Sequence, residues 1–294
     1  MWYYVELMIN GLLIGTLYSL IALGFVLIYK ASDVINFAQG EFVMFGGYVV
    51  AACVQLYGLP LWPSLAAGVV AMIVLGYAVE MVVLKHLIGR PVVAVIMATI
   101  GLASFLRGFA PLLWGVGTKN LSFGLPQDPY FLGEVMLSPA QLFAAMVSLA
   151  CIGAIGWFFS KSRTGVALRA IADDQQTALA MGINVKRYFA ISWAIAGIVA
   201  LVGGVIWGNL IGVDVQLALV GLKVFPVVIL GGLDSVLGAI LGGLVIGVVE
   251  SLAAGFLDPL VGGGTKDFTP YVLMIAVLMV RPSGMFGKVD IERV

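Results

Sequence analysis

Among the ionisable side chains in the long apolar segments of the chain, four are candidates for a functional role: Glu41, Glu80, Arg107 and Glu250. A charged group inside a membrane-spanning segment costs about 2.5–3.5 kcal/mol on insertion scales, so each of the four marks a candidate functional site. Glu41 lies near the start of an apolar segment over 34–56, where a carboxylate also favours a helix N-terminus. A role in gating or structure is therefore predicted for Glu41 ahead of direct substrate contact.

Arg107 is the deepest of these charges, because it lies well inside the apolar segment 92–114. It can attract a substrate carboxylate, or it can pair structurally with Glu80 or Glu250, and the sequence favours neither interpretation. Glu80 lies near Lys85 and can simply reach the membrane interface. The predicted translocation-path or gating residues are Asn36, Gln39, Gly40, Glu41, Arg107 and Glu250.

Glycines surround Glu41 and recur along the chain. Gly40, Gly46 and Gly47 would leave backbone carbonyl and amide groups accessible to a small solute if the helix is distorted. Elsewhere, glycines four residues apart predict close approach of helix backbones, since lipid supplies no hydrophobic driving force between helices. These pairs are Gly11/Gly15, Gly204/Gly208, Gly238/Gly242 and Gly243/Gly247.

No motif for catalysis or cofactor binding is visible in the sequence. The string GGGTK at 262–266 has the residue types of a phosphate-binding loop in the wrong order. Cys53 and Cys151 lie in apolar stretches, without the spacing of a metal site or a disulfide framework. We therefore expect a chain that is not an enzyme and that binds no metal, ATP or other cofactor.

The elements that carry these residues follow from composition. Hydrophobic residues make up 62% of the 294 positions and charged residues 10%, against roughly 45–50% and about 25% in soluble domains. Only helices and closed barrels satisfy backbone hydrogen bonds in lipid, and the alternation typical of barrels is missing. The sequence predicts one all-α transmembrane domain over 1–294, a polytopic helix bundle in a bilayer, with no sign of a nucleic-acid partner.

Apolar runs of about 20 residues, long enough to span a bilayer, define the expected helices. Eight or nine spans are predicted, because the run 218–230 is short, carries Pro226 and is either a crossing or a broken, re-entrant helix. The expected helices cover 5–29, 34–56, 61–84, 92–114, 139–160, 188–211, 218–230, 235–256 and 268–280.

Basic residues predict the orientation, since loops that stay in the cytoplasm carry an excess of Lys and Arg. If 218–230 crosses, eleven of the 15 basic residues share one side and only Lys119, Lys223 and Lys266 fall opposite. The N-terminus is then outside and the C-terminus cytoplasmic, whereas a re-entrant run would move the C-terminal basic residues outside. The eleven are Lys30, Lys85, Arg90, Lys161, Arg163, Arg169, Lys186, Arg187, Arg281, Lys288 and Arg293.

The longest cytoplasmic stretch, 161–187, is predicted to form two short helices. The first covers 166–172; Asp173 is expected to cap the second, with Gln176 as its reciprocal partner, and Gly182 to end it. Such short helices cannot form a core alone. They either dock against a soluble motor or merely connect two spans, and the helix signals alone leave both interpretations open.

Several strings, in order along the whole chain, resemble branched-chain amino acid ABC transporter permeases. One of them lies in the cytoplasmic stretch, and others lie in the first two helices and near the C-terminus. They are LYSLIALG at 17–24, INFAQGEF at 35–42, SRTGVALRAIAD at 162–173 and RPSGMFG at 281–287.

The resemblance implies a permease subunit of an ATP-driven importer in the bacterial inner membrane, with a translocation path shared with a second, related permease. Two ATPase subunits, which would hold ATP and Mg²⁺, and an external solute-binding protein are the other implied partners. The stretch 161–187 would couple to the ATPase, and the residues that match are Arg163, Gly165, Arg169, Asp173, Ala178 and Gly182.

The resemblance leaves the solute open. Branched-chain or other amino acids are expected first, and relatives that import urea or short amides are the alternative. An ion-coupled secondary transporter is a further alternative, because Glu41, Glu80 and Glu250 could serve an ion gradient. An intramembrane enzyme or a channel fits less well, since the sequence has neither a catalytic cluster nor a filter segment.

Overall fold

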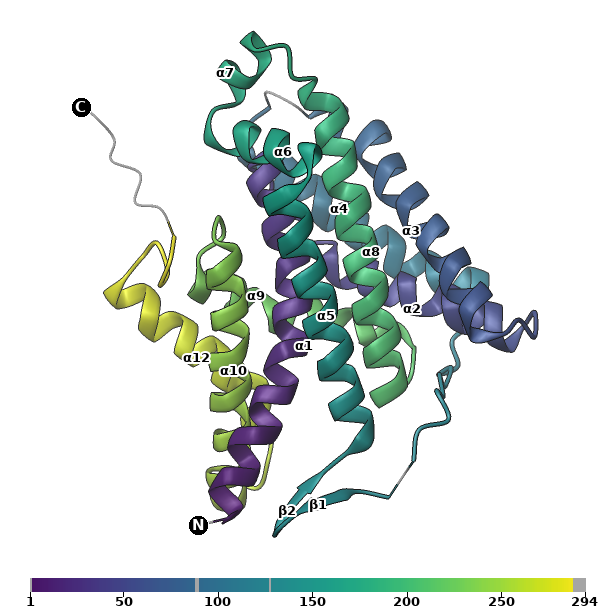
Figure 1. Ribbon diagram of the computed structural model, residues 1–294, viewed down its shortest axis with the longest axis vertical. Helices are drawn as coiled ribbons and strands as arrows, with labels where there is room; N and C mark the ends of the chain where they lie inside the picture. Colours follow the sequence, from purple (N-terminus) through teal and green to yellow (C-terminus); the bar gives the residue numbers. More distant parts are fainter. Residues whose placement is uncertain (1, 88–89, 127, 288–294) are drawn as a thin grey trace. The chain divides into compact units, whose positions relative to one another are not determined.

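The computed structural model describes residues 2–87, 90–126 and 128–287, and Figure 1 shows a chain built mostly of helices. The helices are α1 Trp2–Ser32, α2 Gln39–Gln55, α3 Leu61–Val82, α4 Val92–Trp114, α5 Pro139–Lys161, α6 Arg163–Asp173, α7 Gln175–Ala180, α8 Val185–Ile211, α9 Leu219–Gly231, α10 Val236–Phe256, α11 Asp258–Val261 and α12 Thr265–Val280. Two 3-10 turns and two strands complete the described chain: η1 Leu84–His86, η2 Val215–Ala218, β1 Tyr130–Leu132 and β2 Val135–Leu137.

Six of the described helices are long and apolar enough to cross a membrane: α1, α3, α4, α5, α8 and α10. This confirms a polytopic membrane bundle but not the predicted eight or nine spans. The remaining apolar helices are shorter, with 17 residues in α2, 13 in α9 and 16 in α12. The short run around Pro226 is helical, as expected, and Pro226 lies inside α9.

The chain falls into two compact units, with boundaries inside α1, α5 and α9. Unit 1 comprises Met1–Val26, Gly124–Leu149 and Leu222–Val294, and unit 2 comprises Leu27–Phe123 and Ala150–Gly221. The prediction of one domain over 1–294 is not tested by this division. Of the basic residues used to predict orientation, Lys288 and Arg293 lie outside the described residues.

Glycines bring α1 and α10 into backbone contact in unit 1. A Cβ at Gly11 would lie 2.7 Å from the Val248 Cα, and one at Gly15 would lie 2.8 Å from the Gly243 carbonyl oxygen. Such close approach allows extensive van der Waals contact between helices in lipid. The predicted close packing at Gly11/Gly15 and Gly243/Gly247 is therefore confirmed.

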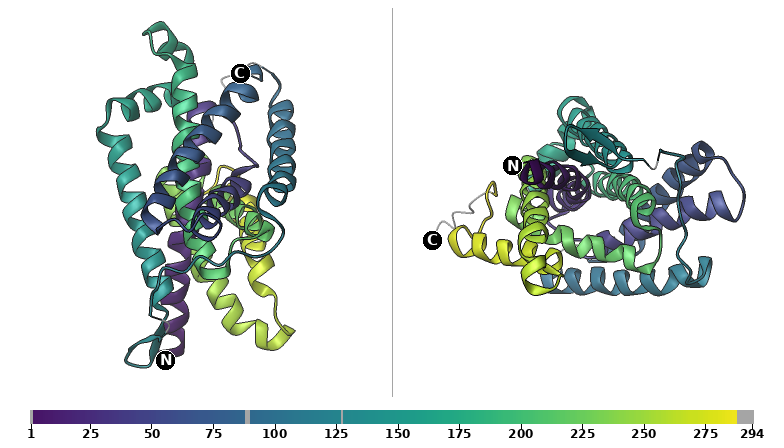
Figure 2. Two further views of the ribbon diagram at one scale, coloured as in Figure 1. Left: turned by 90° about the vertical axis from the view of Figure 1, so that its right-hand side faces the viewer. Right: turned by 90° about the horizontal axis from the view of Figure 1, so that it is seen from below.

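The core of unit 2 is made by α2, α3 and α8. Figure 1 shows α2 lying across α8 and α3 running alongside it, and Figure 2 shows the same helices from two further sides. A Cβ at Gly204 of α8 would lie 2.0 Å from the Val43 carbonyl oxygen, and one at Gly76 of α3 would lie 2.4 Å from the Trp193 carbonyl oxygen. These glycines let the backbones of α2 and α3 each touch the backbone of α8.

A two-stranded hairpin in unit 1 was not predicted. β1 and β2 pair antiparallel, with Tyr130 opposite Leu137, and Gly133 in the turn has a φ of +68°. Strands of three residues carry too short an alternation to be read from sequence. The hairpin directly precedes α5 and leaves the mostly helical class unchanged.

Candidate functional site

Asn36 and Gln39 begin a polar cluster at the entrance to α2 in unit 2. The Asn36 side-chain oxygen accepts a hydrogen bond from the Ala38 backbone N–H at 3.0 Å, and its amide nitrogen donates to the Gln39 side-chain oxygen at 3.2 Å. Asn36 thus forms a turn that starts the helix. Both residues are fully buried, and Gln39 Nε2 has no hydrogen-bond partner among the described residues. A buried donor without a partner is costly, so this atom is a candidate contact for a solute.

Glu41 and Arg107 complete the polar cluster with an ion pair that joins α2 to α4. The Arg107 guanidinium donates a hydrogen bond to Glu41 Oε1. Glu41 is buried in the first turn of α2, where the helix N-terminus also favours its charge, whereas the Arg107 side chain is 42% exposed. The expected structural pairing of Arg107 with Glu80 or Glu250 is wrong. Because α4 packs against α2, Arg107 meets Glu41 instead.

Gly40 lies in the same turn but presents no open backbone. A Cβ there would lie 2.2 Å from the Ala218 carbonyl oxygen and 3.0 Å from the Gly221 Cα. Gly46 and Gly47 are also buried, against the backbone of Leu201 and Gly204. The expectation that these glycines expose carbonyl and amide groups is therefore wrong. They allow α2 to contact α8, η2 and the start of α9, because only a residue without a side chain fits there.

The coupling segment, residues 161–187, begins with a tight turn from α5 into α6. The Ser162 hydroxyl accepts a hydrogen bond from the Gly165 N–H at 2.8 Å and so caps α6. A Cβ at Gly165 would lie 2.5 Å from the Phe159 carbonyl oxygen, which explains a glycine at this position. Arg169 Nη2 donates a hydrogen bond to the Ser160 carbonyl oxygen at 3.3 Å. This oxygen lies in the last turn of α5, where the negative end of the helix dipole favours a cation.

The second helix of the coupling segment is capped one residue later than predicted. The Asp174 carboxylate accepts hydrogen bonds from the N–H groups of Gln176 at 2.8 Å and Thr177 at 3.0 Å. Asp174 is extended, whereas Asp173 is the last residue of α6 and still helical, so Asp173 is not the cap. The hydroxyl and amide of Thr177 and the amide of Gln176 hold the pKa of the Asp174 carboxyl below its usual value.

The end of α7 agrees with the prediction. Gly182 has a φ of +82°, its N–H donates to the Leu179 carbonyl oxygen, and the Ile183 N–H donates to the Ala178 carbonyl oxygen at 3.0 Å. This is the Schellman arrangement, which favours glycine at the left-handed position. Asn184 then caps α8, because its side-chain oxygen accepts a hydrogen bond from the Arg187 N–H.

The two short helices bury one side and expose another. A buried cluster in unit 2 unites them with the end of α1 and the start of α8; its members are Ala31, Leu168, Ile171, Ala178, Val185 and Phe189. Three other apolar side chains of the segment are exposed instead: Val166 is 52%, Leu179 54% and Met181 79% exposed. We call these three residues the exposed apolar face. Arg163 and Asp173 are exposed charged residues of the same segment.

The family described as branched-chain amino acid transport system / permease component matches residues 7–278. The chain belongs to this permease family. The permease is 32% identical to LivH, a high-affinity branched-chain amino acid transport system permease protein of Escherichia coli (strain K12), over 99% of this chain and 98% of LivH. It is 31% identical to BraD, a protein of the same description from Pseudomonas aeruginosa, over 100% of this chain and 99% of BraD.

Among solved structures, PsaBC from Streptococcus pneumoniae in complex with Fab matches 93% of the permease and 91% of its own chain, with a TM-score of 0.48 and 12% identity. The family membership and the six apolar helices establish a multi-pass protein of the inner membrane. They also confirm the resemblance that the four sequence strings indicated.

Glu250 belongs to unit 1 of the permease, whereas the residues of the polar cluster belong to unit 2. It is buried in α10 and forms a hydrogen bond with Tyr18 of α1, while its Oε2 atom has no hydrogen-bond partner among the described residues. The structure thus brings together Asn36, Gln39, Gly40, Glu41 and Arg107 of the predicted set. Within the described residues, no group of three or more His, Cys, Asp or Glu is placed to hold a metal ion.

Sequence reasoning missed both the cap of α7 and the exposed apolar face. Asp173 and Asp174 are both of a residue type preferred at a helix N-terminus, so the sequence alone did not select the cap between them. The exposed apolar face could not be predicted, because Val166, Leu179 and Met181 look like core residues until the buried side of each helix is known.

Proposed function

We propose that this permease is the membrane subunit of an ATP-driven importer that carries a small polar solute, a branched-chain amino acid first among the candidates. The observation that carries the proposal is the coupling segment. Its two capped helices are anchored by a buried cluster and present an exposed apolar face outside the long spans. Large exposed apolar side chains on short helices outside the long spans are candidates for contact with a protein partner.

The proposed partners are a second, related permease that completes a heterodimer, two ATPase subunits and an external solute-binding protein. The relatives support this assembly, because LivH and BraD are each described as the permease protein of a transport system. ATP and Mg²⁺ would bind on the ATPase subunits. The chain itself would act as one transmembrane domain over 1–294, with residues 161–187 as its contact to the ATPase.

The coupling residues divide by their surroundings into two groups. Gly165, Ala178 and Gly182 fix the shape of the helix pair, because each occupies a place that a larger or less flexible residue would disturb. Arg163 and Asp173 are exposed on its surface, while Arg169 also contacts the end of α5. A motor that moves the pair would therefore move it as a unit.

A physical route leads from the coupling segment to the polar cluster within unit 2. α7 continues into α8 through the Asn184 cap, and α8 touches α2 where Gly204 meets the Val43 carbonyl. A displacement of α7 would thus shift the helix that carries Glu41. The proposed mechanism is alternating access, in which the Glu41–Arg107 pair forms in one state and loosens in the other.

The translocation path is proposed to use the polar cluster, with Gln39 Nε2 as the most available group for a solute. Glu250 is a second candidate for the path. Its carboxylate forms a hydrogen bond with Tyr18, and its Oε2 atom has no hydrogen-bond partner among the described residues. A buried, half-satisfied carboxylate is also what an ion-coupled secondary transporter requires. That transporter is the second candidate function.

Uptake into proteoliposomes separates the two candidates. The permease, co-purified from its host with whatever subunits accompany it, is reconstituted and tested with radiolabelled leucine, and separately with urea and acetamide. Uptake that needs ATP, and that an ion or proton gradient cannot replace, is expected. Gradient-driven uptake by the purified permease alone would contradict the importer and favour the secondary transporter.

A further inference from the structure

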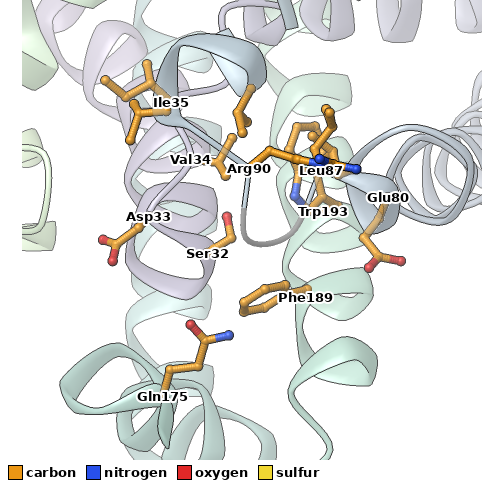
Figure 3. Close-up of a pocket in the computed structure, with 13 residues that line it drawn as sticks. Ser32, Asp33, Val34, Ile35, Glu80, Leu87, Arg90, Gln175, Phe189 and Trp193 are labelled. Atoms are coloured by element: carbon orange, nitrogen blue, oxygen red, sulfur yellow. The ribbon is translucent and has the colours of Figure 1, made fainter. Parts of the chain in front are cut away.

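Unit 2 contains a pocket of about 190 Å³ that neither the polar cluster nor the exposed apolar face explains. Figure 3 shows its lining, which comes from the end of α1 and the chain after it, from α3 and the chain after it, and from α4, α7 and α8. Sites for drug-sized ligands measure roughly 300–1,000 Å³. A volume below that range suits a molecule of the size of an amino acid.

Three charged side chains line this pocket: the exposed Asp33, and Glu80 and Arg90, which form no ion pair with each other. Glu80 is only 6% exposed, yet among the described residues its carboxylate makes neither a hydrogen bond nor an ion pair, and Lys85 and Lys186 act on it only at longer range. Arg90 lines the same pocket, and its guanidinium is likewise unpaired within the described chain. Figure 3 shows both side chains on one side of the pocket. A buried carboxylate without a cation in contact with it is unfavourable, so the Glu80 carboxylate lacks a positive partner.

The rest of the wall is largely apolar and rigid. Leu84, Val95, Phe189 and Trp193 are each no more than 9% exposed, and all four line the pocket. Phe42 packs edge-on against Trp193 and holds the indole in place. Apolar walls with a few well-placed polar groups are the usual composition of a small-molecule site.

We propose that this pocket binds the zwitterion of a small aliphatic amino acid, with its ammonium group at Glu80, its carboxylate at Arg90 and its side chain against Phe189 and Trp193. A zwitterion supplies both missing partners at once. A simple amine or a simple carboxylate would leave one of the two charges unmatched.

The position of the pocket gives it a consequence for transport, and this part rests on the proposed function. Arg90 and the coupling segment belong to the basic-rich parts of the chain that are predicted to be cytoplasmic. The pocket would therefore be accessible to the imported amino acid on the cytoplasmic side. Gln175, the first residue of α7, also lines it. A bound amino acid would therefore favour one position of α7 and slow ATP-driven uptake when product accumulates, provided that it binds the two states differently.

Binding is tested first on the full-length permease alone in nanodiscs, by equilibrium dialysis with radiolabelled L-leucine. Saturable binding is expected, and L-leucinamide, which lacks the carboxylate, and 4-methylpentanoate, which lacks the ammonium group, should each compete at least about tenfold more weakly. Absence of saturable binding, or equal competition by either analogue, would overturn the proposal.

Variants then assign the site. Glu80→Gln and Arg90→Gln should each weaken leucine binding at least about tenfold, whereas the exposed Arg187→Gln, which lies outside the pocket, should not. Arg90 is exposed, so Arg90→Gln is expected to fold. It therefore still tests the site if Glu80→Gln does not fold. Unchanged binding in Arg90→Gln would place the leucine elsewhere and overturn the proposal.

ATP-driven uptake, measured in parallel, keeps the two proposals apart. If uptake needs ATP but leucine does not bind the pocket, only the pocket proposal fails. If leucine binds with the expected variant pattern but uptake does not depend on ATP, the importer fails and the binding site stands.

Discussion

The polar cluster at the start of α2 and the coupling segment distribute polar and apolar groups in opposite ways. In the polar cluster, amide and carboxylate groups are buried among apolar helices and bond mostly to one another and to Arg107. In the coupling segment, the exposed apolar face lies on short helices outside the long spans. Buried polar groups require partners inside the molecule, whereas exposed apolar groups require partners outside it. Changes in the first region should therefore act on the permease itself, and changes in the second on its assembly.

Removal of the coupling segment is expected to have the largest effect. Replacement of residues 163–182 by a Gly/Ser linker of equal length should reduce ATP-driven uptake to background, because no flexible chain can transmit a displacement from a motor. Uptake and ATP hydrolysis are measured together, and size-exclusion chromatography checks that the variant is monodisperse. Uptake that survives this replacement would refute the coupling role.

A change at the contact between α2 and α8 is expected to be the next largest. Gly204→Val places side-chain atoms where the Val43 carbonyl oxygen lies, so the two helices must separate, at a cost of about 1–3 kcal/mol. The midpoint of thermal aggregation in detergent should fall, together with uptake. Gly108→Ala in α4, where a Cβ meets nothing within 4 Å, is the matched control and should leave both unchanged. An unchanged aggregation midpoint and unchanged uptake in Gly204→Val would mean that this contact does not stabilise the packing of α2 on α8.

The ion pair of the polar cluster should respond unequally to loss of its two members. Arg107→Gln leaves a carboxylate buried and unpaired, at a cost of about 1–3 kcal/mol, whereas Glu41→Gln leaves a guanidinium on a side chain that is 42% exposed. Thermal stability should therefore fall more in Arg107→Gln than in Glu41→Gln, and the double variant should recover part of the loss. Equal losses in the two single variants would contradict the burial of Glu41.

The cap of α7 should give the smallest effect. Asp174→Ala should speed hydrogen exchange at the amides of Gln176 and Thr177, while Asp173→Ala should not. Because the pKa of Asp174 is lowered in the folded state, the cap stabilises α7 above the ordinary carboxyl pKa and is lost as pH falls through the lowered value. Faster exchange in Asp173→Ala instead would return the cap to the predicted residue.

Apolar runs bounded by charged residues or by Pro and Gly predicted most of the helices, including the short one around Pro226. These runs could be recognised because they are local features of the sequence. The coupling segment was predicted as two helices ended by Gly182 for the same reason. The cap was misplaced by one residue, since adjacent aspartates are equivalent until the end of α6 is known.

The partner of Arg107 could not be predicted, because it depends on which helices pack together rather than on local sequence. The sequence suggested Glu80 or Glu250 as the partner, and only the contact of α4 with α2 selects Glu41 instead. The role of Gly40 is similar. Its neighbours, Ala218 and Gly221, are far away along the chain. The sequence therefore could not show that Gly40 is packed against another segment, and an accessible backbone was predicted instead.

Docking of an ATPase subunit on the exposed apolar face is the step on which the proposed importer depends, and co-purification tests it. The double variant Leu179→Glu, Met181→Glu keeps the buried cluster and all caps, and Gln176→Glu adds a charge to the same helix outside the face. After mild detergent extraction, subunits are identified by mass and ATPase activity is assayed. The ATPase is expected to accompany the parent permease and Gln176→Glu but to be lost from the double variant. An ATPase retained at parental level by the double variant would contradict docking at this face.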